Sequence, residues 1–215
     1  DRYNVPVINQ HERRVFMDNK HNDRRIFDLA MHTWLRYALV FLKWLLWAAV
    51  IGMALGFIST AFHYSVDFAQ ELRLAHPWLL CLLPVGGLII VFMYRACGVK
   101  DDRGANAVLE ATINGEPVKK RVAPLIFTGT VLTHLFGGSA GREGAALQLG
   151  GSIAGLFGGV FHIKPGDGRV LTICGMSAAF SALFGTPITA AVFAVSVASA
   201  GAVQYAALFP SVVSA

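Results

Sequence analysis

Two long apolar blocks constrain this chain more than any other feature of its sequence. The first covers residues 34–60 (WLRYALVFLKWLLWAAVIGMALGFIST) and the second covers residues 77–94 (PWLLCLLPVGGLIIVFMY). About 20 apolar residues in a helix cross the ~30 Å hydrocarbon core of a bilayer. The chain is also only 14% charged, against about 25% in soluble domains. We therefore expect an all-α integral membrane protein.

The basic residues predict the orientation of these blocks. Residues 1–30 and residues 95–121 are both rich in Lys and Arg, whereas the segment 61–76 carries Asp67 and Glu71. Because basic segments next to membrane spans stay in the cytoplasm, we expect the N-terminus and residues 95–121 there, and 61–76 outside. This predicts a cytoplasmic segment, 1–33, and a membrane domain, 34–215, in the plasma or bacterial inner membrane.

Several classes of function are disfavoured by the same sequence. The net charge of +5 lies in short segments between apolar blocks, which reports membrane orientation and not nucleic-acid binding. The three cysteines are scattered without metal-ligand spacing, so we expect no metal and no cofactor. We found no pairing of a nucleophile with a base and no phosphate-binding loop, so we do not expect an enzyme.

After residue 122 the apolar blocks become short and rich in Gly and Ala. They cover about 122–136, 145–163, 170–184 and 187–209. Small residues let helices approach closely in lipid. Short helices interrupted within the membrane are typical of transport sites, since irregular backbone survives there where it lines a cavity. Ordinary close-packed spans with kinks are the alternative.

The stretch GGSAGREGAALQLGGS (137–152) places Arg142 and Glu143 between glycines inside this region. An ionised carboxylate at the centre of a bilayer costs about 2.5–3.5 kcal/mol, so such a residue is usually functional or paired. Neighbours on a helix point about 100° apart and pair poorly, which favours a functional Glu143. The glycines predict a tight turn into a helix whose first turn begins near Gly144. Its free amides can bind a small anion, for which the Glu143 carboxylate competes until it is protonated.

The segment GREGAALQLGGSIAGLF (141–157) resembles the G-(K/R)-E-G-P signature of the CLC family of chloride channels and proton-coupled anion transporters. A second segment, AAFSALFGTPITAAVFAV (178–195), is similar to the family's AAGLAAAFNAPLAGILF region. The resemblance implies a CLC-type bundle of tilted, partly broken helices that transports chloride or fluoride. It implies that Glu143 is the external gate and that protons bind to this carboxylate. The anion then lies at the amides of Gly144 and Ala145, beside Gly141 and Arg142.

The chain departs from the family pattern around the expected anion site. Ala145 replaces the signature proline. The family's G-S-G-I-P segment, whose serine coordinates the central anion, falls near DDRGANAVLEA (101–111). There Gly104 fits, Arg103 occupies the serine position, and Asn106 is a substitute donor.

A further departure concerns the coupled proton. Ser196 or Val197 stands where family exchangers usually carry an internal proton-transfer glutamate. The fluoride-exporting branch of the family also lacks the central serine and this glutamate. The resemblance therefore favours fluoride mildly and leaves chloride open, and it leaves both a channel and a proton antiporter open.

Only the first of the family's two inverted halves is recognisable in this chain. The halves share the anion site, so we expect the second half to lie outside this chain and to complete the pathway. The resemblance also implies a homodimer packed through the helices around 170–215. The competing hypothesis is a non-transporting membrane fragment or scaffold, in which Glu143 forms a structural pair with Arg142.

Overall fold

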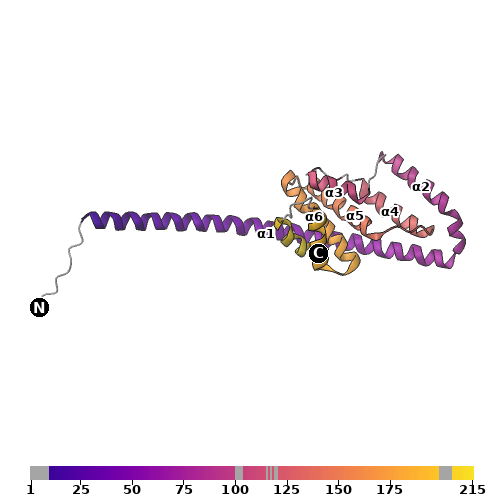
Figure 1. Cartoon of the computed structure of the whole chain (residues 1–215), viewed down its shortest axis with the longest axis horizontal. Coiled ribbons are helices and arrows are strands. Elements are labelled where there is room, and N and C mark those ends of the chain that lie inside the picture. The colour runs from indigo at the N-terminus through magenta and orange to yellow at the C-terminus, as the bar shows by residue number, and fades with distance from the viewer. Residues whose placement is uncertain (1–9, 100–103, 115, 117, 119–120, 199–204) are drawn as a thin grey trace. The chain divides into compact units, whose positions relative to one another are not determined.

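The computed structural model describes residues 10–99, 104–114, 116, 118, 121–198 and 205–215, and these residues form helices without any strand (Figure 1). The all-α prediction is thereby confirmed. The elements are α1 (Gln10–Ala75), the 3₁₀ helix η1 (Pro77–Leu82), α2 (Leu83–Ala96), α3 (Ala105–Asn114), α4 (Val122–Leu135), α5 (Arg142–Val160), α6 (Pro165–Phe184), α7 (Pro187–Val197) and α8 (Tyr205–Ser214). Two compact units divide the chain, residues 1–44 and residues 45–215. Every contact discussed below lies within the second unit.

The first membrane span is longer than its sequence block. We predicted an end near residue 60, but α1 continues to Ala75, and its apolar part, Thr33–Ala75, is long enough to cross a membrane. The reason is local, because no glycine or proline interrupts the sequence between Gly56 and Pro77. Residues 61–75 are therefore helical, and they carry Asp67 on a rigid element.

The second predicted span agrees closely with the structure. Proline at position 77 begins η1, α2 follows directly, and together they form an apolar stretch, Pro77–Ala96, that is long enough to cross a membrane. Proline is favoured at a first helical position because its missing N–H has no partner to lose there. Most side chains of α2 are exposed, which in a membrane protein suits contact with lipid.

The short apolar blocks form the packed part of the molecule. The first three correspond to α4, α5 and α6, and Pro187 begins α7 as predicted. The block at about 187–209 holds α7, which ends at Val197, and the first half of α8, which covers Tyr205–Ser214. At the centre, α5 and α6 cross where Gly150 faces Gly175, so closely that a Cβ atom on either glycine would collide with the carbonyl of the other.

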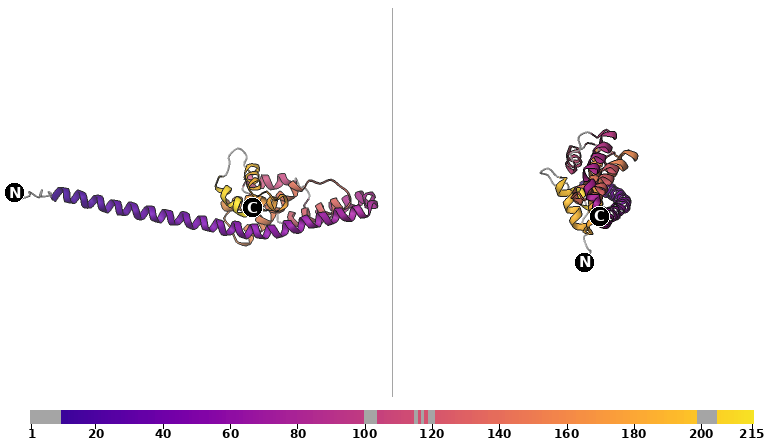
Figure 2. Two further views of the ribbon diagram at one scale, coloured as in Figure 1. Left: turned by 90° about the horizontal axis from the view of Figure 1, so that it is seen from below. Right: turned by 90° about the vertical axis from the view of Figure 1, so that its right-hand side faces the viewer.

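The part of α1 after Leu45 runs along one side of these shorter helices, as Figure 2 shows. Three contacts define this arrangement. Gly52 lies against the carbonyl of Ser214 at the end of α8, and the Trp47 ring meets Phe161 with centroids 4.9 Å apart. Farther along, the buried Phe62 packs edge-on against Phe127 of α4. This placement brings the last turns of α1 to the beginning of α5.

Candidate functional site

The beginning of α5 has the features of an anion-binding helix end. The helix starts at Arg142, two residues before the position expected from the sequence, after Gly141 in an extended conformation (φ −66°, ψ 135°). No side chain caps it. A helix leaves its first four amides without partners inside the helix, and these belong here to residues 141–144. The helix dipole adds roughly half a positive charge at this end.

Glu143 occupies the first turn of α5 and is exposed. Its Oε2 atom lies 2.9 Å from the point that a Cβ atom on Gly141 would occupy. The carboxylate therefore folds back over the glycine that precedes the helix, and any larger residue at 141 would push it away. Among the described residues, no ion-pair partner of Glu143 is found.

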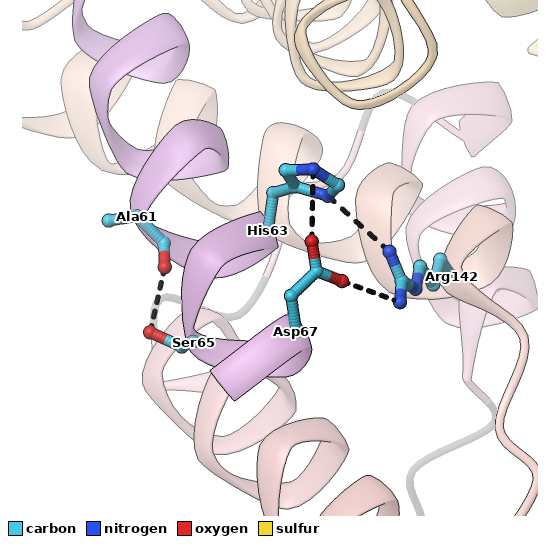
Figure 3. A network of polar contacts seen from close by, with 5 residues as sticks. All are labelled: Ala61, His63, Ser65, Asp67 and Arg142. Carbon is cyan, nitrogen blue, oxygen red and sulfur yellow. Dashed lines mark hydrogen bonds and ion pairs between the residues drawn. The ribbon is translucent and has the colours of Figure 1, made fainter. Parts of the chain in front are cut away.

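Arg142 points to α1 instead of to its neighbour (Figure 3). Its Nη2 donates to Oδ1 of Asp67 at 3.0 Å, and its Nη1 lies 3.4 Å from Nδ1 of His63. The second carboxylate oxygen of Asp67 lies 3.2 Å from Nε2 of His63. These contacts occupy the guanidinium on the α1 side, so the structural pair between Arg142 and Glu143 is not formed.

The two segments expected to hold the anion lie next to each other. Gly144 faces Ala105, the first residue of α3, with 3.7 Å between the Cβ of Ala105 and the point that a Cβ on Gly144 would occupy. Gly104, just before α3, has a left-handed backbone (φ +62°), which glycine adopts readily, and Asn106 is exposed. The N-terminal end of α3 and the N-terminal end of α5 therefore lie next to each other.

The remaining predicted positions are less informative. Ala145 follows the free amides and is buried. Arg103, which takes the position of the family's serine, lies outside the described residues. Ser196 is exposed near the end of α7, where its hydroxyl donates to the Val192 carbonyl at 2.7 Å, and Val197 follows it. Neither side chain of the pair at 196–197 carries a carboxylate.

Sequence reasoning missed Asp67 and His63 as members of this site. We had placed Asp67 in the segment outside the membrane, and we had connected neither Asp67 nor His63 with Arg142. The available signal was the spacing of His63 and Asp67, four residues apart, which puts both on one face of a helix. This spacing is informative only when residues 61–67 are expected to be helical, and we had expected the helix to end near residue 60.

A cavity of about 340 Å³ lies near the other end of α5. Its walls come from the end of α3, the second half of α5 and the first turns of α6, and they include Thr112, Glu116, Gly155, Gly158, Arg169 and Thr172. None of the predicted site residues lines it. No group of three or more His, Cys, Asp or Glu side chains that could hold a metal occurs in the part of the chain that the structure describes.

The family model described as voltage gated chloride channel matches residues 86–215, which include the whole of α5 and both expected anion segments. This chain belongs to the voltage-gated chloride channel (CLC) family. A solved CLC-type fluoride/proton antiporter superposes with a TM-score of 0.75 at 35% identity, covering 81% of this chain and 44% of the antiporter chain. The predicted CLC-type helical bundle is thereby confirmed.

Two curated relatives extend the comparison. A chloride/fluoride channel protein of Pseudomonas syringae pv. tomato is 40% identical over 174 residues, which are 80% of this chain and 38% of the relative. The H(+)/Cl(-) exchange transporter ClcA of Vibrio campbellii is 26% identical over 163 residues, which are 69% of this chain and 35% of the relative. The chain thus spans well under half the length of these CLC relatives.

Proposed function

We propose that this chain is the gate-bearing part of a CLC-type halide transport protein, with Glu143 as the gate. The observation that carries the proposal is the state of Glu143, which is exposed, has no ion-pair partner among the described residues and folds over Gly141 at the start of α5. A carboxylate there competes with an anion for the same amides. Protonation removes its charge and lets the anion in.

The anion binds, in this proposal, where the ends of α3 and α5 meet. The free amides of residues 141–144 supply donors, and the small Gly144 and Ala145 leave room for the ion. Gly104 brings the backbone of the preceding segment close, and Asn106 adds a neutral donor. Arg142, the first residue of α5, places a positive charge at this helix end, and Asp67 offsets part of that charge.

The transported ion is fluoride or chloride. The 40% identical relative is named for both ions, and the superposed antiporter is named for fluoride and protons. The position at 196–197 lacks a carboxylate, so Glu143 alone would carry the proton by moving between two sides of the gate. A second half of the transporter, outside this chain, completes the pathway in this proposal, and two copies form a homodimer in a plasma or inner membrane with the N-terminus in the cytoplasm.

The decisive experiment replaces Glu143 with Gln in the complete transporter that contains this chain. Purified protein in liposomes loaded with potassium fluoride or potassium chloride is assayed with ion-selective electrodes at several pH values. We expect wild-type flux to fall by up to about tenfold per pH unit above the titration of the gate, because the neutral fraction of a carboxyl group falls at that rate. Glu143→Gln mimics the neutral form, so its flux should not vary with pH.

Glu71→Gln is the matched control, because Glu71 is an exposed carboxylate on α1. It should retain the wild-type pH profile. Unchanged flux and an unchanged pH profile in Glu143→Gln would falsify the gate. If the substitution lowered only the melting temperature of the purified protein, the scaffold hypothesis would replace it.

A further inference from the structure

Three side chains form a closed cluster next to the gate, and we call them the Arg142 clamp: His63, Asp67 and Arg142 (Figure 3). Asp67 uses both carboxylate oxygens, Oδ1 for Arg142 at 3.0 Å and Oδ2 for His63 at 3.2 Å. The third side of the triangle joins His63 Nδ1 to Arg142 Nη1 at 3.4 Å. The cluster ties a rigid part of α1 to the first residue of α5, across 75 positions of sequence.

One tautomer of His63 satisfies all three contacts of the clamp. An arginine side chain can only donate, so Nδ1 of His63 must accept from Arg142. The proton of the imidazole then lies on Nε2 and is donated to Asp67. In this arrangement His63 is neutral, and the positive charge of Arg142 is balanced by the negative charge of Asp67. A protonated imidazole has no lone pair for Arg142, so the clamp is complete only with the neutral ring.

The balance matters because Arg142 immediately precedes Glu143. The other charged or titratable side chains on the elements around the start of α5 are Tyr64, Glu71 and Arg73 near the end of α1, His76 directly after it, Glu110 in α3 and His134 in α4. His134 is buried, and its Nδ1 lies 2.8 Å from the Thr130 carbonyl. Glu110 is on the second turn of α3, away from Ala105. Arg142 is adjacent to the gate in the sequence, whereas Arg73 of α1 lies against Gly137, six residues before Glu143.

We propose that Asp67, oriented by His63, is a positioning residue of the gate: it holds the Arg142 guanidinium on α1 and offsets its charge, and it thereby sets the pH at which Glu143 opens. The inference rests on the proposed function of Glu143. Without Asp67, the charge of Arg142 favours the ionised form of the neighbouring carboxylate. The gate then needs more acid to open.

Asp67→Asn tests this, since it keeps the shape of the side chain and removes its charge. In the liposome assay with fluoride, the midpoint of the flux–pH curve should move to lower pH, and flux at neutral pH should fall about two- to fivefold. This is the effect expected from a partly exposed ion pair, for which a fivefold change corresponds to about 1 kcal/mol. The control Glu71→Gln should leave the midpoint in place.

The double variant Asp67→Asn with Arg142→Gln separates charge balance from mere structure. With both charges removed, nothing is left uncompensated, so the midpoint should return toward the wild-type value. Arg142→Gln alone should move it to higher pH, because the Asp67 carboxylate then stands unbalanced. A double variant that shifts as far to low pH as Asp67→Asn would overturn the proposal.

Two further variants keep the test decisive. If Asp67→Asn does not give folded transporter on size-exclusion chromatography, the direction of the shift in Arg142→Gln alone decides, and a shift to lower pH would refute the clamp. His63→Ala should shift the midpoint in the same direction as Asp67→Asn but by less, since it only loosens the orientation of Asp67. If the midpoint shifts neither in His63→Ala nor in Asp67→Asn, the clamp is also refuted.

Different results would contradict the clamp and the gate assignment. If Glu143→Gln behaves like wild type, the gate assignment is wrong regardless of Asp67. If Glu143→Gln abolishes the pH dependence but Asp67→Asn leaves the pH curve unchanged, the gate stands and the clamp is wrong. In the Glu143→Gln background, Asp67→Asn should have no effect on the pH profile, because no titrating gate remains.

Discussion

Helices α2 and α5 are both apolar, yet they place their side chains in opposite environments. In α2, Gly86 is the buried residue, while Leu88 and Phe92 are 70% and 74% exposed. In α5, all of residues 145–154 are buried. The exposed side chains of α2 are large, whereas the buried stretch of α5 is made mainly of Gly, Ala and Ser with a few larger residues.

The difference shows what hydrophobicity does in each helix. In lipid, an exposed Leu or Phe is already in an apolar solvent, so α2 needs no protein around it. Association of α5 with α6 has to come from close packing, which small residues permit. A rigid α5 also matters for the site, because its first turn carries Glu143, the proposed gate, and its buried middle fixes where that turn lies.

Among the substitutions that test this comparison, a change of Gly150 should have the largest effect on stability. A Cβ atom there would collide with the carbonyl group of Gly175, which is backbone and cannot rotate away. We expect Gly150→Ala to destabilise the protein by about 3 kcal/mol or more, at the upper end for overpacked cores, and Gly150→Leu to prevent folding. The measurement is the apparent melting temperature of the purified transporter in detergent, together with its yield.

Gly87→Ala on α2 is the control for this substitution. No atom lies within 4 Å of the point that its Cβ would occupy. Alanine also has a better helix propensity than glycine by about 1 kcal/mol, so stability should stay or rise. Equal losses at Gly87 and Gly150 would show that smallness in α5 has nothing to do with the crossing with α6.

Much of this fold followed from local patterns in the sequence. Apolar length gave the two spans, and the proline at position 187 gave the start of α7, because these signals act within a few residues. The end of the first span was misplaced because Asp67 and Glu71 suggested a polar connection. A helix without Gly or Pro carries such side chains without breaking, and only Pro77 ended it.

The site was predictable in part for the same reason. The glycines around Arg142 and Glu143 indicated a helix end open to an anion, and α5 begins within two residues of that position. The partner of Arg142 could not be predicted from the sequence, because Asp67 is 75 positions away and no local spacing pairs the two residues. Tertiary packing of α1 on α5 decides which of the two neighbouring charges is balanced.

The same substitution in both helices gives the next largest contrast. Leu149 on α5 is 2% exposed, whereas Leu88 on α2 is 70% exposed. Leu149→Ala should leave a cavity and destabilise the protein by about 2–5 kcal/mol. Leu88→Ala should cost far less, because lipid fills the space. Both values come from unfolding by SDS titration, and a Leu88→Ala variant as unstable as Leu149→Ala would show that another part of the transporter covers α2.

The smallest effect should come from two adjacent glycines of α2. Gly86 lies against the Phe136 ring, whose Cδ2 atom an added Cβ would overlap, whereas no atom lies within 4 Å of an added Cβ on Gly87. Because a ring can shift where a carbonyl cannot, Gly86→Ala should destabilise by about 1 kcal/mol, at the lower end for overpacking. Phe136 directly precedes the glycines that lead to Glu143, so Gly86→Ala should also change fluoride flux slightly, and Gly87→Ala should not. If the two variants agree in stability and in flux, the packing of Gly86 against Phe136 has no part in placing the proposed gate.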